Sequence, residues 1–497
     1  MKRSGLLGGA LILSAGTVLA KIFSAVYRIV LTRVLGGVGI GLYQLIFPLY
    51  SLCVVLVTAG LPLAVSKLVA KYPNSSKKIV KKTIFFITII ALIVTILMLV
   101  VGRISVDTEI YVCYYLLAPT LVVIANSSIL KGYFQGVHQF IPSAISSIIE
   151  QFVKMIIGLL LAISFIKINI IASIIGAMIG IMLSEIVSLI ILLIYYKKGK
   201  SRDKNIINLT YSEILRDIIP ITLTNIILPF ASFVDSILVV KLLSNNFAND
   251  VSVFLYGLES GAVSSLVTIP TIFSFALASV LLPNIAKDTN GWNKNYNLSL
   301  SIKIILTIVV PCVICFVFIP DRLLCLLYGD RLCDLGIDGT KIAGALLSLS
   351  GIGMVALSIN QIYSVSLQGV NERMVTIRNM IIAVVIKFVI ELIFLPTVML
   401  NIYSLAIANT ICYIVVLALN HAEIVRTFHL KINYTFGAKL LLSNSLMVLA
   451  MIGILAFGNS ISNTLLSGVV GVIVYLGSLI ILKIFNKNDL AMLKYKT

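Results

Sequence analysis

Long apolar stretches separated by short polar connections make up almost the whole chain. Each stretch is close to the roughly 20 residues that cross the hydrocarbon core of a bilayer as a helix. Backbone polar groups in lipid must be hydrogen-bonded within their own segment, so spans of this kind are helical. The pattern predicts an all-α polytopic membrane protein with about 14 transmembrane helices. The predicted segments are 6–34, 40–70, 84–101, 110–130, 141–165, 170–196, 213–243, 252–285, 299–319, 342–368, 380–395, 403–419, 440–457 and 464–482.

The composition agrees with a membrane protein and excludes a soluble one. Of the 497 residues, 60% are hydrophobic and 11% are charged, a balance that no soluble domain of this length keeps. The basic start and the apolar run ending in Val18-Leu19-Ala20 imitate a secretory signal with a small-residue cleavage site. The apolar run continues to about Leu35, so we expect an uncleaved first helix. The seven cysteines lie mostly in apolar segments and predict no disulfide framework, although Cys325 and Cys333 share the longest outer loop and could pair.

The basic excess reports membrane orientation. The chain carries a net charge of +19, and its lysines and arginines gather in alternate connections, most densely at 71–82 and 197–204. By the positive-inside rule, both termini are predicted to be cytoplasmic. Asp107, Asp321 and other acidic residues occupy the opposite connections. The charge is therefore a topology signal, and we predict no nucleic-acid partner.

Enzymatic function is disfavoured by what the connections lack. They are too short for a soluble catalytic domain, and no Gly-x-x-x-x-Gly-Lys-Ser/Thr phosphate loop occurs. His138, His421 and His429 fall in predicted loops without metal-ligand or triad companions. We predict a non-enzymatic protein without metal or cofactor.

A repeated unit divides the chain into lobes. Gln135-Gly136-Val137 recurs as Gln368-Gly369-Val370, and each triplet is followed, at one ungapped offset, by a lysine deep inside the next span: Lys154 and Lys387. This predicts parallel repeats around a central cavity. The predicted divisions are an N-terminal six-helix lobe at 1–196, a basic cytoplasmic linker at 197–212, a C-terminal six-helix lobe at 213–435, and two further transmembrane helices with a cytoplasmic tail at 436–497.

The first helix carries one polar face along most of its length. Its members recur at three- and four-residue steps, namely Ser14, Thr17, Lys21, Ser24 and Arg28. At 1.5 Å per residue, Lys21 is about 22 Å from the inner end at Leu6, beyond the middle of a core about 30 Å thick. We favour a cavity charge for Lys21 over a lysine that locks helices through a carboxylate. Arg28 lies nearer the outer boundary, where snorkelling is the alternative.

Lysines with acidic neighbours recur in the fifth and eleventh helices. Glu150 and Lys154 are one turn apart and could neutralise each other. Lys387 has Glu391 on its other side, so the lysine keeps its place between the repeats while the acid moves. Each such charge costs about 3 kcal/mol at the membrane centre. A functional role for the lysines is therefore favoured over packing.

Further carboxylates stand in membrane segments. Asp235 lies on the seventh helix beside Pro229, and Glu185 lies on the sixth helix. Asp235, Glu185, Glu150 and Glu391 are predicted coupling-ion or counter-charge sites. Structural salt bridges are the alternative.

The chain resembles a known family at several runs. These are GLYQLIFPLY at 41–50, GLPLAVSK at 60–67, KGYFQG at 131–136 and IEQFVK at 149–154, joined in the second lobe by 228–236 and 367–387. They resemble the stage V sporulation protein B group, in the polysaccharide-transport branch of the multidrug/oligosaccharidyl-lipid/polysaccharide exporter superfamily. The resemblance covers essentially the whole chain.

The resemblance implies a flippase for an undecaprenyl-pyrophosphate-linked saccharide, such as the peptidoglycan precursor of the spore cortex. It implies two lobes facing a central cavity, with the lipid-linked saccharide, membrane lipid and cell-wall synthesis enzymes as partners. Lys21 matches a basic position on the first helix of related lipid II flippases. Their basic residue on the eighth helix has no equivalent at 266–278.

These observations predict a flippase of the cell membrane that works by alternating access. The predicted ligands of the pyrophosphate are Lys21, Arg28, Lys154 and Lys387. One alternative is a cation-coupled multidrug exporter of the same superfamily. Another is a membrane-embedded glycosyltransferase or polymerase that uses the acidic residues of 320–341. The saccharide, the direction, the coupling ion and the oligomeric state stay open.

Overall fold

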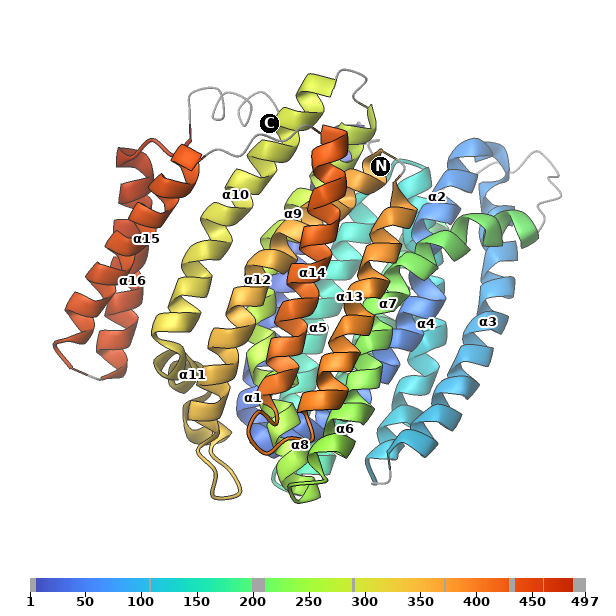
Figure 1. The fold of residues 1–497 in the computed structure, drawn as a ribbon. Helices are drawn as coiled ribbons and strands as arrows, with labels where there is room; N and C mark the ends of the chain where they lie inside the picture. The colour runs from blue at the N-terminus through green and yellow to red at the C-terminus, as the bar shows by residue number, and fades with distance from the viewer. Residues whose placement is uncertain are drawn as a thin grey trace. The chain divides into compact units, whose positions relative to one another are not determined.

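The protein is built from α-helices throughout the part that the structure, a computed structural model, describes: residues 6–106, 109–198, 211–287, 291–370, 372–428, 434–458 and 460–485 (Figure 1). These residues form no β-sheet. The helices are α1 (Leu6–Thr58), α2 (Leu61–Lys71), α3 (Ser76–Ser105), α4 (Val112–Gly136), α5 (Ile141–Phe165), α6 (Ile170–Lys198), α7 (Tyr211–Leu243), α8 (Asn249–Gly257), α9 (Ser264–Lys287), α10 (Gly291–Phe318), α11 (Pro320–Tyr328), α12 (Gly339–Gly369), α13 (Arg373–Phe394), α14 (Tyr403–Phe428), α15 (Tyr434–Leu455) and α16 (Ile461–Ile481).

The predicted all-α polytopic architecture is confirmed. Within the described residues, 12 helical stretches are long and apolar enough to cross a membrane. One of them covers both α1 and α2, which were predicted as two segments. Helix α13 is of similar length but carries Arg378, Lys387 and Glu391. Of these charged residues, Lys387 and Glu391 are buried.

Helix α1 changes direction at a single glycine. Gly36 has φ 71° and ψ −173°, a conformation that side chains with a Cβ rarely adopt. It divides α1 into a first arm before Gly36 and a second arm from Gly37 to Thr58. The predicted break between 34 and 40 is therefore present. The second predicted segment, however, ends in a separate helix, because the chain turns again at 59–60 before α2.

The chain divides into two compact units. Unit 1 comprises residues 1–265 and 392–402, and unit 2 comprises residues 266–391 and 403–497. The connection between α8 and α9 is a π-helical turn, Leu258–Val263, which ends just before the boundary of unit 1. The predicted linker at 197–212 lies mostly outside the described residues, as does the C-terminal tail beyond residue 485. The predicted lobe boundaries thus stay a prediction.

Glycines bring helices of unit 1 into backbone contact. A Cβ on Gly180 of α6 would lie 2.3 Å from the Cα of Gly158 on α5, so α6 has no room for a side chain at this position. The second arm of α1 meets α8 in the same way, because a Cβ on Gly257 would lie 2.6 Å from the Cα of Gly41. Small residues spaced four apart allow such crossings in membranes, where helices gain no hydrophobic advantage from meeting.

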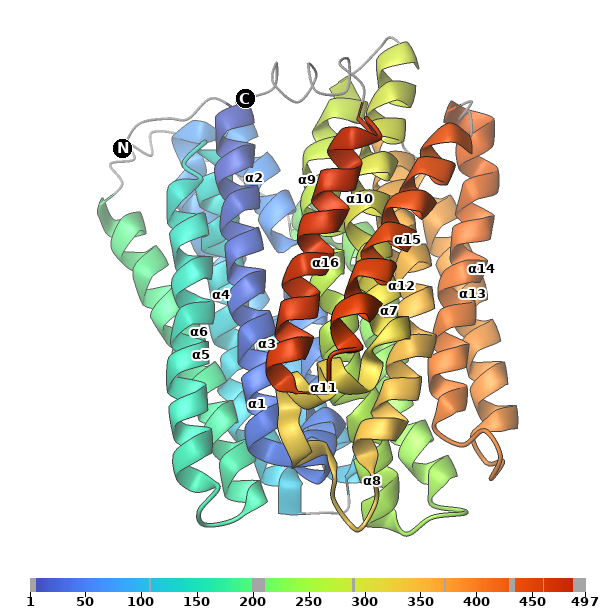
Figure 2. The same cartoon turned by 90° about the vertical axis from the view of Figure 1, so that its left-hand side faces the viewer.

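Unit 2 attaches the two C-terminal helices through α10. Helices α15 and α16 lie side by side (Figures 1 and 2), and α15 also contacts α10. The hydroxyl of Tyr475 on α16 donates a hydrogen bond to the Thr307 carbonyl on α10 at 2.6 Å. Buried Met447 and Met451 fill the space between these helices. The additional pair is thus packed onto the body of unit 2.

The loop predicted at 320–341 contains the short helix α11 and a 3₁₀ turn, Gly329–Leu332. Cys325 and Cys333 are exposed free thiols, so the pairing considered from the sequence is not formed. Asp338 caps the start of α12 by accepting a hydrogen bond from the Lys341 backbone N–H at 3.3 Å. Cys325, Cys333 and Lys341 are exposed in this segment.

Replacing Gly180 by leucine should destabilise the protein by about 1–3 kcal/mol or more, because its side chain would meet the α5 backbone and force the two helices apart. Thermal melting of the purified protein in detergent measures the effect. Gly468→Leu on α16, where a Cβ meets nothing within 4 Å, is the matched control. An unchanged melting temperature for Gly180→Leu would contradict the close packing.

Candidate functional site

Polar side chains of α1 are hydrogen-bonded to the π-helical turn between α8 and α9. Both arms of α1 bind the same carbonyl: the Arg28 guanidinium donates to the Ser260 oxygen at 3.4 Å, and the Gln44 amide donates to it as well. A π turn moves its carbonyls out of the regular α-helical ladder, which makes them available to side chains. Arg28 is therefore held near the Gly36 bend. Lys21 lies on the same face, two turns earlier and partly exposed.

Helices α5 and α6 run antiparallel in a register that their close contacts define. Gly158 faces Gly180, and the Ser188 hydroxyl donates a hydrogen bond to Glu150 at 3.1 Å. Both contacts belong to one register, and in that register Lys154 lies opposite Ser184 and beside Glu185. Figure 2 shows the two helices next to each other along their length. The charged residues of α5 and α6 thus lie along the same helix–helix interface as the glycine contact.

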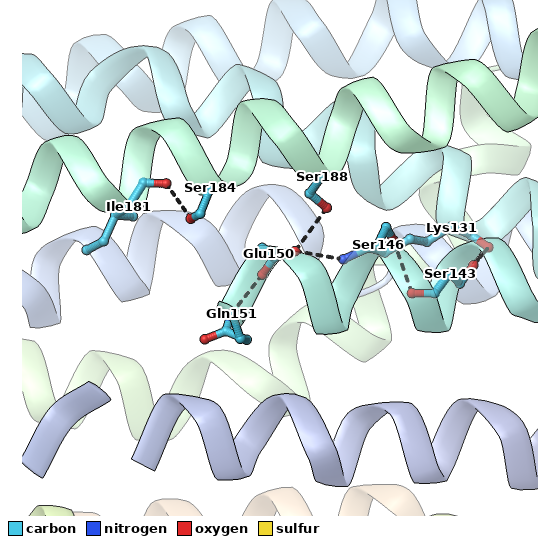
Figure 3. A network of polar contacts seen from close by, with 8 residues as sticks. All are labelled: Lys131, Ser143, Ser146, Glu150, Gln151, Ile181, Ser184 and Ser188. Carbon is cyan, nitrogen blue, oxygen red and sulfur yellow. Dashed lines mark hydrogen bonds and ion pairs between the residues drawn. The ribbon is translucent and has the colours of Figure 1, made fainter. Parts of the chain in front are cut away.

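The Glu150 carboxylate lies at the centre of a polar network. It accepts from the Lys131 ammonium of α4 at 3.2 Å, from Ser188 of α6 at 3.1 Å and from the neighbouring Gln151 amide at 2.9 Å. Figure 3 shows Lys131 and Ser188 turned toward this carboxylate from different helices. The side chains of Lys131 and Glu150 are 22% and 12% exposed, so this ion pair is largely shielded from solvent. The network around Glu150 joins three helices of unit 1, namely α4, α5 and α6.

Lys154 lies between aromatic rings and acidic groups. Its ammonium is 5.0 Å from the ring centre of Tyr27 and 5.8 Å from that of Phe47, both on α1. Such positions stabilise a cation over the ring face. The Glu185 and Glu150 carboxylates lie within electrostatic range of its ammonium, and so does Arg28, which repels it. Two cations, Arg28 and Lys154, therefore lie within electrostatic range of each other, with Lys154 beside aromatic rings of α1.

The local Glu150–Lys154 pair considered from the sequence is only a secondary interaction. The salt bridge of Glu150 is with Lys131, and within the described residues Lys154 forms no salt bridge with Glu150 but lies within electrostatic range of both Glu185 and Glu150. The physical reason is that the facing helices α4 and α6 bring Lys131 and Ser188 within hydrogen-bond distance of Glu150. A one-turn separation on one exposed helix would give only a few tenths of a kcal/mol.

Sequence reasoning missed Lys131 and Glu259. The predicted fourth segment ended at residue 130, which put Lys131 in a loop, whereas α4 continues to Gly136. Its position in the KGYFQG run was the available signal. Glu259 is 4% exposed in the π-helical turn, and it could have been found as an acid inside the predicted segment 252–285. Asp235, which was predicted, is 8% exposed on α7.

Unit 2 contains its own buried ion pair. The Lys387 ammonium lies 3.5 Å from Glu391, one turn further along α13, and the two side chains are 5% and 0% exposed. The same face of α13 carries Asn379, whose amide donates to Asn420 at 2.8 Å, and Asn420 donates to Asn360 at 2.6 Å. In this conformation Glu391 neutralises Lys387, so its role as a substrate ligand stays a prediction.

Metal-binding clusters are not evident. Nowhere in the described ranges do three or more His, Cys, Asp or Glu side chains gather as a metal would require. His421 accepts or donates a hydrogen bond with the Tyr363 hydroxyl at 3.0 Å, and His138 lies in the turn after α4. His429 lies outside the described residues.

Three relatives from Bacillus subtilis match the chain. Stage V sporulation protein B is 34% identical over 152 residues, and the uncharacterized membrane protein YabM is 31% identical over 149 residues. Each of these two matches covers 29% of this chain, and they span only 29% and 28% of the relatives' lengths. Lipid II flippase MurJ is 23% identical over 426 residues, which cover 78% of this chain and 77% of MurJ.

Solved structures share the fold. A lipid II flippase MurJ in the inward closed conformation aligns with a TM-score of 0.67 and 16% identity, over 94% of this chain and 98% of that one. An inward-facing multidrug resistance MATE family transporter aligns with a TM-score of 0.64 and 15% identity, over 84% of this chain and 98% of that one. At these identities the likeness establishes the fold alone.

The polysaccharide biosynthesis protein family model matches residues 6–288, more than half of the chain. The relatives and structures whose names state an activity are flippases and transporters, and none is an enzyme. The chain therefore belongs to the polysaccharide biosynthesis protein family, as a multi-pass membrane protein.

Proposed function

We propose that the protein flips an undecaprenyl-pyrophosphate-linked saccharide across the cytoplasmic membrane by alternating access. The observation that carries this proposal is the pair of neighbouring cations, Arg28 and Lys154, inside membrane-embedded helices, with Lys154 beside aromatic rings of α1. A pyrophosphate cannot shed its charge in lipid, and charge-assisted hydrogen bonds from such cations replace the lost water. The likeness to lipid II flippase MurJ along most of the chain supports the same substrate class.

The candidate ligands differ in how readily they can serve. Arg28 and Lys154 are partly exposed, and Lys21 lies on the same face of α1 as Arg28. Lys387 would have to exchange Glu391 for the substrate, which requires a conformation other than the one described. Glu150, Glu185 and Glu391 act in this proposal as counter-charges. Asp235 stays a candidate coupling-ion site.

The membrane orientation is part of the proposal. The described lysines at 67–82 gather at the α2–α3 connection, and the positive-inside rule places this connection, with both termini, in the cytoplasm. Helix α11 and its loop then face outward. Cell-wall synthesis enzymes that make and use the lipid-linked saccharide are the predicted partners, in peptidoglycan or spore cortex assembly.

A multidrug exporter is the second candidate, supported by the fold shared with the MATE family transporter and by the buried acids. The two neighbouring cations, Arg28 and Lys154, favour an anionic substrate instead. Resistance to cationic dyes on overexpression, without flipping of a lipid-linked saccharide, would reverse this preference.

In liposomes containing a fluorescent undecaprenyl-pyrophosphate disaccharide, Lys154→Ala should lower the flipping rate at least about tenfold, because one charge-assisted contact of about 1.5–3 kcal/mol is lost. Arg28→Ala should have a similar effect. Lys341→Ala, which removes an exposed lysine from the outer segment, is the matched control and should flip the probe at the wild-type rate. Equal rates for all four proteins would refute the site.

The buried pair of α13 can be tested without leaving an unpaired charge. In the double variant Lys387→Met and Glu391→Met, two apolar side chains replace the pair, which commonly preserves or raises stability. If Lys387 binds the headgroup, flipping should fall at least about tenfold while the melting temperature is kept. Wild-type flipping in the folded double variant would show that the pair is structural.

The orientation predicts which thiols are accessible from outside. A membrane-impermeant maleimide should label Cys325 and Cys333 in intact cells, because both are exposed in the outer segment. In a Cys325→Ser and Cys333→Ser background, Asn74→Cys at the α2–α3 connection should react only after permeabilisation. The opposite labelling pattern would mean that both termini face outward.

A further inference from the structure

Glu185 is the one carboxylate of the unit 1 network that no hydrogen bond fixes within the described residues. It lies on α6 one turn before Ser188, on the side that faces α5, and it is partly exposed. Glu150, by contrast, accepts three hydrogen bonds from α4, α5 and α6. The two acids therefore have different freedom to change their protonation state.

The charges that face Glu185 come from every helix packed against α6. Helix α5 contributes Glu150 and Lys154, α4 contributes Lys131, and α1 contributes the phenol of Tyr50. Lys131 is already bound to Glu150 at 3.2 Å. Lys154, the second cation near Glu185, forms no salt bridge within the described residues, so it is the one that an arriving ligand can bind.

Lys154 is also a proposed ligand of the substrate headgroup. An arriving pyrophosphate brings negative charge to Lys154 and competes with Glu185 for its ammonium. Close negative charges in a shielded site favour protonation of the group that can accept a proton. Since Lys131 and the other donors hold Glu150, the adjustment falls on Glu185.

A proton fits this position better than a metal ion. Sodium, magnesium and calcium sites need several oxygen ligands around the ion. Around Glu185, two ammonium groups occupy the neighbouring space and would repel such an ion. The nearby Ser188 hydroxyl is bound to Glu150, and being a hydroxyl it adds no carboxylate oxygen as a ligand. A proton needs only one carboxylate oxygen and access to water.

We propose that Glu185 takes up one proton from water when an anionic pyrophosphate headgroup binds at Lys154, so that headgroup and proton bind together. This inference rests on the proposed function. In the uptake step an O–H bond of a hydronium ion in the adjoining water breaks, an O–H bond forms on the Glu185 carboxylate, the negative charge of the carboxylate disappears, and a neutral water molecule remains. By linkage, the converse also holds: protonation of Glu185 releases Lys154 and strengthens headgroup binding.

The test is calorimetric titration of the full-length protein in lipid nanodiscs with farnesyl pyrophosphate. Measurements at one pH in buffers with different heats of ionisation give the number of protons taken up per bound ligand. The wild type should take up about one proton more than Glu185→Gln, which imitates the protonated acid. The probe's own titration is the same in both proteins and cancels in this difference.

The affinities provide a second readout. As the pH falls through the range in which Glu185 becomes protonated, the wild type should gain up to about tenfold in affinity per pH unit relative to Glu185→Gln. Glu185→Asp, which keeps a carboxylate, should retain the proton uptake. Asp250→Asn, an exposed acid in the first turn of α8, is the matched control and should behave as the wild type.

The outcomes separate the two proposals. Equal proton uptake by wild type and a folded, monodisperse Glu185→Gln would overturn this inference and leave the flippase proposal standing. Absence of any binding of farnesyl pyrophosphate to the wild type, together with no flipping of the fluorescent probe, would overturn the proposed function and this inference with it. A one-proton difference restored by Glu185→Asp supports the inference.

Discussion

Pairing of buried charges across helices is the constraint on which the first unit of this protein depends. An isolated charge within a bilayer costs several kcal/mol, and a broken buried pair is more costly than an apolar replacement. Lys131 with Glu150 joins α4 to α5, and the Ser188 hydroxyl bound to Glu150 joins α5 to α6. Three helices are thereby held in one register. The same arrangement gives the interior the polar character that an anionic substrate requires.

Glycine is what makes this pairing possible. Backbone contact at Gly158 and Gly180 brings α5 and α6 close enough for Ser188 to reach Glu150. A larger side chain would separate the two helices and break the hydrogen bond between Ser188 and Glu150. On α1, Gly36 turns the chain so that Arg28 before the bend and Gln44 after it hold the same carbonyl of the π-helical turn. Close backbone approach and charge neutralisation therefore support each other.

The two repeats treat the corresponding lysine differently. Lys154 shares its charge between acids on its own and a neighbouring helix and is partly exposed, whereas Lys387 is sealed by Glu391 on its own helix. Lys154 forms no salt bridge within the described residues, so it can meet a ligand at lower cost than Lys387, whose salt bridge with Glu391 is buried. In the proposed transport cycle, this difference assigns first contact with the headgroup to Lys154, and it makes Lys387 dependent on a change of conformation.

The sequence by itself determined the fold class, because the run lengths and the absence of water in the bilayer leave helices as the only solution. It also determined that Lys21, Arg28, Lys154 and Lys387 lie within membrane segments, since a charge in an apolar run is visible without any structure. Partner choice was not determined. The sequence favoured Glu150 as the neighbour of Lys154 because it could compare only residues one turn apart, and it left Lys131 in a loop. Only the tertiary structure decided that Glu150 binds Lys131 and that Lys154 faces Glu185, because these contacts depend on the register that the glycines impose on helices distant in sequence.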